Sequence, residues 1–168
     1  MKPLPPKGIP ATQVFDELES LRADDVDWRN GKVFSLAYYA GPQAIAVAED
    51  AYRRFSGENA LSTDAFPSLR IMQQDVLSMV GPWLGADQDS AGFMTSGGTE
   101  SILMVVKAAR DQFAQTRGVT TPNIVLPTSA HAAFEKACHY FGVESRRSAV
   151  GQDWRADIAA MERLIDDN

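Results

Sequence analysis

The stretch that most constrains the fold of this chain runs over residues 92–110. A short apolar run, Phe93-Met94, leads into Thr95-Ser96-Gly97-Gly98-Thr99, and apolar residues at helical spacing follow. This order is typical of a strand, a tight turn and the start of a helix. Paired glycines let the backbone approach a ligand closely. The first turn of the helix leaves N–H groups without partners at the positive end of the helix dipole, so the turn is suited to a phosphate.

The hydroxyl groups of Ser96, Thr99 and Ser101 supply further donors at this turn. A capped helix that follows a glycine turn and holds no ligand explains the same residues, because helix N-termini bind anions only opportunistically. Both interpretations stay open from the turn alone. The turn is neither a Walker loop nor a dinucleotide fingerprint, since the G-x-x-x-x-G-K lysine and the G-x-G-x-x-G spacing are both absent.

From residue 91 onward, apolar runs and helical patterns alternate. Strands are expected over residues 92–94, 123–127 and 143–150, and helices over residues 99–117, 131–141 and 157–165. Alternation of this kind predicts an α/β fold, with helices on the faces of a parallel sheet. Ligands bind at the carboxyl ends of such strands. The turn and His131 follow two of those ends, so they share one crevice if the first two strands are neighbours.

The part of the chain before residue 91 has a helical character without strand alternation. A proline-rich arm over residues 1–11 is expected to be extended, because proline fixes φ and removes a donor. Helices are expected from about Thr12 to Leu21, from Pro42 to Phe55 and from Pro67 to Val80. The chain is therefore predicted to be an amino-terminal helical segment followed by an α/β region.

Composition excludes several classes of protein. The formal net charge of −6 argues against a nucleic-acid surface. Residues 102–106 are a fully apolar run as long as any in the chain, and they are far too few to span a membrane. The single cysteine, Cys138, cannot form an internal disulfide, which favours a reducing compartment such as the cytoplasm. It lies mid-helix among apolar neighbours and is expected to be a buried hydrophobe rather than a nucleophile.

No metal site is expected from the sequence. Asp24, Asp25 and Asp27 form an acidic turn without the oxygen-rich loop that calcium needs. His131 and His139 are about 12 Å apart along one helix and cannot share a zinc ion. Taken alone, His131 is as well explained by helix capping or core packing as by a ligand role.

The central motif resembles the signature of the sphingosine-1-phosphate lyase family, within the pyridoxal-phosphate-dependent group II decarboxylases. It comprises Thr95-Ser96-Gly97-Gly98-Thr99-Glu100-Ser101-Ile102-Leu103-Met104, with Lys107-Ala108 and Arg110-Asp111 after it. Three other stretches agree with the family: residues 129–137 with 139–142, residues 59–61 with 66–70, and residues 31–33 with Tyr39 and Gly41. The resemblance covers roughly residues 28–165.

The resemblance implies a fold and a cofactor. The fold would be part of the large domain of the aspartate aminotransferase type I class of pyridoxal-phosphate enzymes. An arm and helical segment would occupy residues 1–57, and the first part of the cofactor domain residues 58–168. The cofactor would be pyridoxal 5′-phosphate, with its phosphate at Ser96, Gly97, Gly98 and Thr99. His131 would stack on its pyridine ring.

The resemblance also implies catalytic and substrate residues. His131 and Tyr39 would be catalytic, and Asn59 and Ser62 would bind substrate, with Asn59 approaching from a neighbouring subunit of a homodimer. Ser62 departs from the histidine or asparagine expected at its position, which leaves the substrate open. The substrate would be a small molecule, a phosphorylated amino alcohol or an amino acid.

The family's Schiff-base lysine follows a histidine, and no lysine of this chain does so. The chain is therefore expected to be an incomplete portion of a lyase, inactive by itself. Three hypotheses follow. The first is an aldehyde-lyase of sphingolipid metabolism, which cleaves a phosphorylated sphingoid base into a fatty aldehyde and phosphoethanolamine. The second is an amino-acid decarboxylase, a carboxy-lyase of carboxylic acid metabolism. The third is a noncatalytic fragment that binds a phosphorylated ligand or pairs with another chain.

Overall fold

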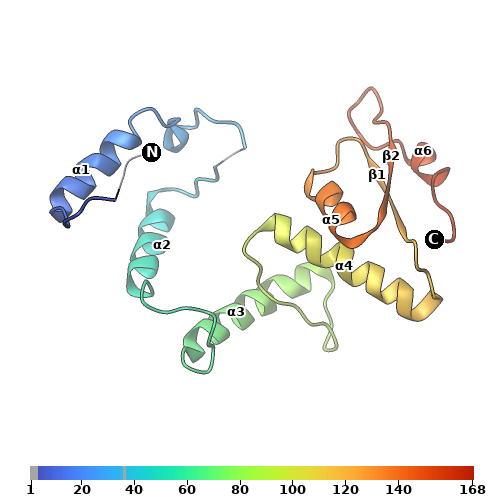
Figure 1. Cartoon of the computed structure of the whole chain (residues 1–168), viewed down its shortest axis with the longest axis horizontal. Helices are drawn as coiled ribbons and strands as arrows, with labels where there is room; N and C mark the ends of the chain where they lie inside the picture. The colour runs from blue at the N-terminus through green and yellow to red at the C-terminus, as the bar shows by residue number, and fades with distance from the viewer. Residues whose placement is uncertain (1–3, 36) are drawn as a thin grey trace. The chain divides into compact units, whose positions relative to one another are not determined.

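The computed structural model describes residues 4–35 and 37–168. The chain divides into two compact units, Met1–Phe66 and Pro67–Asn168, which are described separately (Figure 1). The boundary lies between Phe66 and Pro67, because contacts are denser within each unit than between them. The predicted boundary of the cofactor domain, between residues 57 and 58, stays a prediction.

The first unit is built from short helices. Helix α1 spans Ala11–Leu21, the 3-10 helix η1 spans Trp28–Asn30, and helix α2 spans Pro42–Arg54. Pro42 opens α2 at the position where its missing N–H costs nothing, and Gly41 before it has a φ of 96°. None of the described residues of this unit is buried.

The second unit holds the sheet and the core. Its elements are α3 (Pro67–Val80), η2 (Gly81–Leu84), α4 (Gly98–Arg117), β1 (Asn123–Pro127), α5 (Ala133–Phe141), β2 (Glu144–Ser148) and α6 (Ile158–Glu162). Strands β1 and β2 pair in parallel, with Asn123 opposite Glu144 and Pro127 opposite Ser148. The predicted α/β order is thus present from β1 onward.

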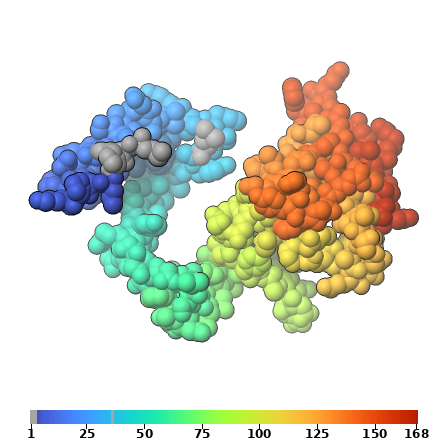
Figure 2. Space-filling view, in the orientation of Figure 1, coloured from blue at the N-terminus to red at the C-terminus, as the bar shows by residue number. Residues whose placement is uncertain are grey.

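The core lies where α4 and α5 pack together. Val106 of α4, Ala137 and Cys138 of α5, and Val143 before β2 form one buried cluster. Ala137 is completely inaccessible to solvent, so α4 approaches α5 closely there. Burial also raises the pKa of the Cys138 thiol, which fits its predicted role as a buried hydrophobe. Figure 2 shows the corresponding yellow, orange and red atoms gathered in one mass.

The strand predicted over residues 92–94 is wrong. Residues 91–95 have no strand assignment, and the sheet contains β1 and β2 alone among the described residues. A strand exists only where a neighbour accepts and donates its backbone hydrogen bonds. The described residues offer no such neighbour here, and Phe93 and Met94 are exposed.

Two other predicted elements are shorter than expected. Strand β2 ends at Ser148, and Val150 instead forms an isolated antiparallel bridge with Ala156. Helix α6 covers only Ile158–Glu162, with the Asp157 carboxylate accepting the N–H of Ala160 at its start. The chain after α6 is bonded to Arg146 of β2.

Arg146 ties the end of the chain to the sheet. Its guanidinium donates to the Leu164 carbonyl at 3.0 Å and to the Asp166 carboxylate at 2.6 Å. The Asn123 amide donates to the same carboxylate at 2.7 Å. The backbone N–H of Asn168, then Arg146 and Asn123, hold the pKa of Asp166 well below its usual range.

Across residues 4–35 and 37–168, no helix has both the length and the apolar character that crossing a bilayer requires. No group of three or more His, Cys, Asp or Glu side chains in those residues is arranged to hold a metal ion.

Candidate functional site

The two glycines of the turn have no role in the packing of the chain itself. Gly97 precedes α4 with φ 160° and ψ 174°, an extended conformation open to any residue, and Gly98 is the first helical residue. A Cβ atom built on either glycine would meet no other atom within 4 Å. Neither backbone conformation nor internal packing therefore requires glycine at these positions. Open space remains in front of the helix start, as close approach by a ligand needs.

Several donors at this helix start have no acceptor. The Ser101 N–H makes the first helical hydrogen bond, to the Gly97 carbonyl at 3.1 Å. The N–H groups of Gly98 and Thr99 precede that bond and have no intrahelical acceptor. Among the described residues, none accepts a hydrogen bond from these two N–H groups or from the Thr99 hydroxyl. The N–H groups of Gly98 and Thr99 and the Thr99 hydroxyl, with the N–H of Glu100 beside them, thus remain for an anion at the positive end of α4.

The Ser96 donors are already engaged. Its N–H and its hydroxyl both donate to one carboxylate oxygen of Glu100, each at 2.6 Å. These bonds, the one from the hydroxyl first, hold the pKa of the Glu100 carboxyl below its usual range. The carboxylate is therefore ionised at neutral pH, and it occupies donors that the sequence had suggested for a phosphate.

A second contact, between two hydroxyl groups, spans the turn. The hydroxyls of Thr95 and Ser101 lie 2.7 Å apart in a hydrogen bond. The Thr95 hydroxyl also donates to the Gly97 carbonyl at 3.2 Å. The Ser101 hydroxyl, one of the donors expected for a ligand, is therefore turned into the loop instead.

His131 caps the helix that follows β1. Its Nδ1 accepts the N–H of Ala133, the first residue of α5, at 3.0 Å, and the imidazole is exposed. An accepting Nδ1 carries no proton, so the hydrogen of the neutral ring sits on Nε2. The structure therefore agrees with the capping interpretation of His131, and the bond from the Ala133 N–H fixes the orientation of the ring. Its stacking on a cofactor, in one crevice with the turn, stays a prediction.

The other predicted site residues lie in the first unit. Tyr39 is 40% exposed, and its ring meets that of Trp28 edge to face with centroids 5.8 Å apart. Asn59 and Ser62 share one exposed loop. The Asn59 side chain accepts the Leu61 N–H at 3.2 Å, and the Ser62 carbonyl accepts two N–H groups of the following turn. Their substrate roles stay predictions.

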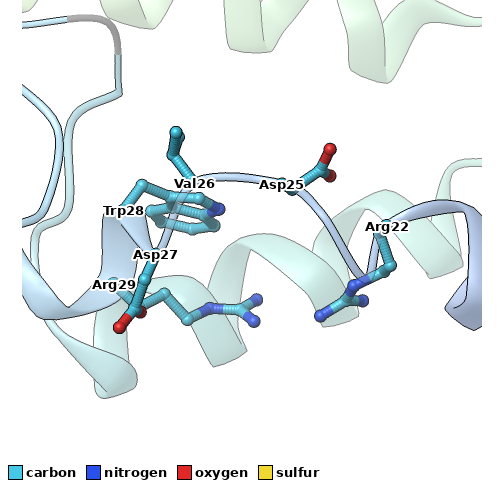
Figure 3. A pocket seen from close by; sticks show the side chains of 6 residues that line it. All are labelled: Arg22, Asp25, Val26, Asp27, Trp28 and Arg29. Carbon is cyan, nitrogen blue, oxygen red and sulfur yellow. The ribbon is translucent and has the colours of Figure 1, made fainter.

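A hollow of about 450 Å³ lies beside η1 in the same unit. It is lined by Arg22, Asp25, Val26, Asp27, Trp28 and Arg29. Figure 3 shows the guanidinium groups of Arg22 and Arg29 on one side of the loop. Each pairs with a carboxylate, Glu19 and Glu49 respectively, and all these side chains are largely exposed. The hollow therefore lacks the enclosed, unpaired donors that a binding site needs.

Sequence reasoning missed the role of Glu100 in the turn. A glutamate at the third position of a helix is the capping-box position, from which its side chain reaches back to the chain before the helix. Glu100 stands at that position after Gly97, Gly98 and Thr99. This spacing was the signal that could have identified it.

No family model matches the chain. The sphingosine-1-phosphate lyase 1 of Rattus norvegicus is 40% identical over 168 residues, which are 100% of this chain and 29% of that protein. The sphingosine-1-phosphate lyase of Oryza sativa is 38% identical over 98% of this chain and 32% of its own length. The solved sphingosine-1-phosphate lyase of Burkholderia pseudomallei superposes with a TM-score of 0.88 at 30% identity, over 100% of this chain and 40% of that one.

The chain is similar to sphingosine-1-phosphate lyases over its whole length. The resemblance expected from the motifs is thereby confirmed, and so is the α/β fold. The lyase-like chain spans about a third of the length of these curated relatives. A probable L-tyrosine/L-aspartate decarboxylase of Methanosarcina mazei is 32% identical over 96% of the chain and 43% of its own length. A glutamate decarboxylase of Lactobacillus brevis has a TM-score of 0.79 at 18% identity, a likeness of fold alone.

Proposed function

We propose that this chain is the phosphate-holding part of a pyridoxal-phosphate-dependent carbon–carbon lyase. The reaction is the aldehyde-lyase cleavage of a phosphorylated sphingoid base into a fatty aldehyde and phosphoethanolamine. One observation carries the proposal: the donors of Gly98 and Thr99 have no acceptor among the described residues, and a Cβ on Gly97 or Gly98 would meet open space, in a chain similar to sphingosine-1-phosphate lyases along its whole length.

The residues at the turn fit the phosphate of this cofactor. Backbone N–H groups of Gly98 and Thr99 donate to phosphate oxygens at the start of α4, and the Thr99 hydroxyl adds a third donor. Gly97 lets the phosphate approach without a Cβ in the way. These donors are uncharged, so the site is compatible with the formal charge of −6. The cofactor, when bound, supplies an electron sink for a carbanion on the substrate.

The other residues orient the cofactor and the substrate. The imidazole of His131 would stack on the cofactor ring, and its bond to the Ala133 N–H holds the imidazole in one orientation. Tyr39 acts beside the substrate, while Asn59 and Ser62 line its cavity. The whole protein is proposed to be a cytoplasmic homodimer, with Asn59 contributed by the neighbouring subunit.

A carboxy-lyase is the second candidate function. The 32% identity to the probable decarboxylase of Methanosarcina mazei favours it specifically. The same turn would hold the same cofactor, and the bond broken would be that to a carboxylate. Assay of the whole protein that contains this chain, for aldehyde from a phosphorylated sphingoid base and for carbon dioxide from amino acids, separates the two.

The binding step can be tested on the chain itself. We expect pyridoxal 5′-phosphate to raise the melting temperature and to shift the amide NMR signals of Gly98 and Thr99, as a native-state ligand does. Pyridoxal, which lacks the phosphate, should do neither at the same concentration. The Thr99→Val variant removes one donor and keeps the side-chain shape, and we expect about tenfold weaker binding.

Equal effects of pyridoxal and pyridoxal 5′-phosphate would contradict a phosphate-holding turn. So would shifts confined to amides away from residues 96–101. The matched control is Thr116→Val on the same helix, whose hydroxyl donates to the Gln112 carbonyl and faces no ligand. This variant should bind the cofactor as the unmodified chain does.

A further inference from the structure

Glu100 is a negatively charged residue placed at a turn that is proposed to hold a negatively charged group. Its carboxylate does not use the free donors of Gly98 and Thr99. It reaches back instead to the N–H and hydroxyl of Ser96, with both contacts at 2.6 Å. We infer that Glu100 is a positioning residue, which binds Ser96 and thereby holds the Gly97–Gly98 backbone open for phosphate. This inference rests on the proposed function of the turn.

Two nested contacts enclose the glycine pair. The outer contact joins Thr95 to Ser101 through their hydroxyls, at 2.7 Å. The inner contact joins Ser96 to Glu100. The two glycines between these anchors have no packing partners of their own, since a Cβ at either would touch nothing. The conformation of the glycines is therefore determined by the residues on both sides.

The glycine pair makes such anchoring necessary. Glycine loses more conformational freedom on ordering than any other residue. A ligand that must order a flexible loop binds more weakly by the cost of that ordering. Bonds to an ionised carboxylate are about twice as strong as bonds between neutral groups. The Ser96–Glu100 contact thus orders the turn before the ligand arrives and lowers the cost of binding.

The same contact divides the donors of the turn between two anions. Glu100 takes both donors of Ser96, while the N–H groups of Gly98 and Thr99 stay free. Ser96 is accordingly a positioning residue rather than a phosphate ligand. A simple competitor for phosphate would instead occupy the free donors at the start of the helix.

The test is the affinity of the chain for inorganic phosphate and for pyridoxal 5′-phosphate, followed by NMR at the Gly98 and Thr99 amides. Glu100→Ala removes the acceptor, and we expect about fivefold to tenfold weaker binding. Glu100→Gln keeps an oxygen acceptor for Ser96 and removes the charge, and we expect affinity within about twofold of the unmodified chain or tighter. Ser96→Ala removes one of the two donors and should weaken binding by a smaller factor.

Asp157→Ala is the matched control. Asp157 caps α6 by accepting the Ala160 N–H at 3.0 Å, so its loss removes a helix-capping carboxylate elsewhere in the same unit. Glu100→Ala and Asp157→Ala should both lower the melting temperature. Only Glu100→Ala should change phosphate affinity. A purely structural role for Glu100 predicts the same affinity in both variants and the unmodified chain.

Each result has one consequence. Unchanged binding by Glu100→Ala overturns the inference and leaves Glu100 a purely structural role. Tighter binding overturns it too and makes Glu100 a competitor of phosphate. If Glu100→Ala does not fold, weaker binding by Ser96→Ala still supports the inference, and unchanged binding still overturns it. Failure of the unmodified chain to bind either ligand overturns the proposed function, and this inference with it. Binding by the unmodified chain that is insensitive to both residues overturns the inference alone.

Discussion

The two units of this chain use similar helices with opposite results. Residues Pro67–Asn168 bury a core between α4 and α5, whereas no described residue of Met1–Phe66 is buried. Helix α1 has apolar side chains at helical spacing, and it still leaves Phe15, Leu18 and Leu21 exposed. An apolar stripe thus allows a helix to pack, but a core forms only where a second surface covers that stripe.

The second surface in the carboxy-terminal unit comes from α5 and the segment that leads into β2. Ala137 and Cys138 are small, so α4 comes close enough for Val106 to be enclosed. Hydrogen bonds between side chains of α5 and β2 then hold the helix against the strand. Glu135 of α5 accepts from Ser145 and Arg147 of β2, at 2.5 and 2.6 Å. In the first unit, the ion pair that joins η1 to α2, Arg29 with Glu49, is long at 3.8 Å and exposed.

The largest expected effect comes from one substitution made in both units. Val106 is 4% exposed and Val47 is 72% exposed, and both lie within helices. Val106→Asp buries an unpaired charge, and we expect a loss of about 4 kcal/mol in the free energy of unfolding. Val47→Asp should change that free energy by less than about 0.5 kcal/mol. Urea unfolding followed by circular dichroism measures both.

Similar losses for the two variants would break the comparison. They would mean that α2 is covered in solution, by a second copy of the chain or by another segment. The oligomeric state of the Val47→Asp variant, from light scattering, would then distinguish these cases.

Acid should weaken the carboxy-terminal unit next. The hydroxyl of Ser145, and then Arg147, hold the pKa of Glu135 below its ordinary value of 4.5. The native state therefore binds fewer protons than the unfolded state, and stability is lost as the pH falls below about 4.5 toward the lowered value. We expect the protection of α5 and β2 amides against hydrogen exchange, taken relative to the intrinsic rate at each pH, to fall between pH 5 and pH 3, with pH 6 as the reference.

The control for the acid experiment is Glu135→Gln, which cannot ionise and should lose part of the pH dependence. Asp50 of α2 has its pKa lowered as well, by Arg54 and then Arg53 of the same helix. Those bonds join residues within one helix, so acid should affect α2 less than the contact between α5 and β2. Equal losses of protection against hydrogen exchange in α2 and α5 would contradict this distinction.

The smallest expected effect separates two arginines. Arg146 is 24% exposed and joins β2 to the chain after α6, whereas Arg54 is 67% exposed and pairs within α2. Arg146→Gln should speed hydrogen exchange at Ile165 and slightly lower the unfolding midpoint. Arg54→Gln should leave the midpoint unchanged, because exposed ion pairs contribute little. A larger drop in the unfolding midpoint for Arg54→Gln than for Arg146→Gln would contradict the view that contacts between elements stabilise the carboxy-terminal unit more than contacts within α2 stabilise the first unit.

Local chemistry accounts for the parts of the fold that the sequence predicted well. Pro42 and Pro67 open α2 and α3 where expected, since a missing N–H costs nothing in a first helical turn. Gly118 and Gly142 end α4 and α5 with φ of 68° and 65°, the left-handed conformation that glycine adopts freely. These signals act over a few residues, so the sequence alone is enough to read them.

The candidate site divides in the same way. The glycine turn and its free donors at Gly98 and Thr99 follow from local order, and the motif also indicated the family. The direction of the Glu100 side chain was not predicted, because several acceptors and donors compete within one turn. The capping bond of His131 was one of two open alternatives until the position of the Ala133 N–H was known.

By itself, the sequence determined the helices, the two strands that pair, the glycine turn and the likeness to sphingosine-1-phosphate lyases. Tertiary structure decided that residues 92–94 form no strand and that Val106 is enclosed while Val47 is not. The physical reason is range. Caps, turns and helical periodicity depend on neighbours within a few residues, whereas strand pairing and burial depend on surfaces that the rest of the fold brings together.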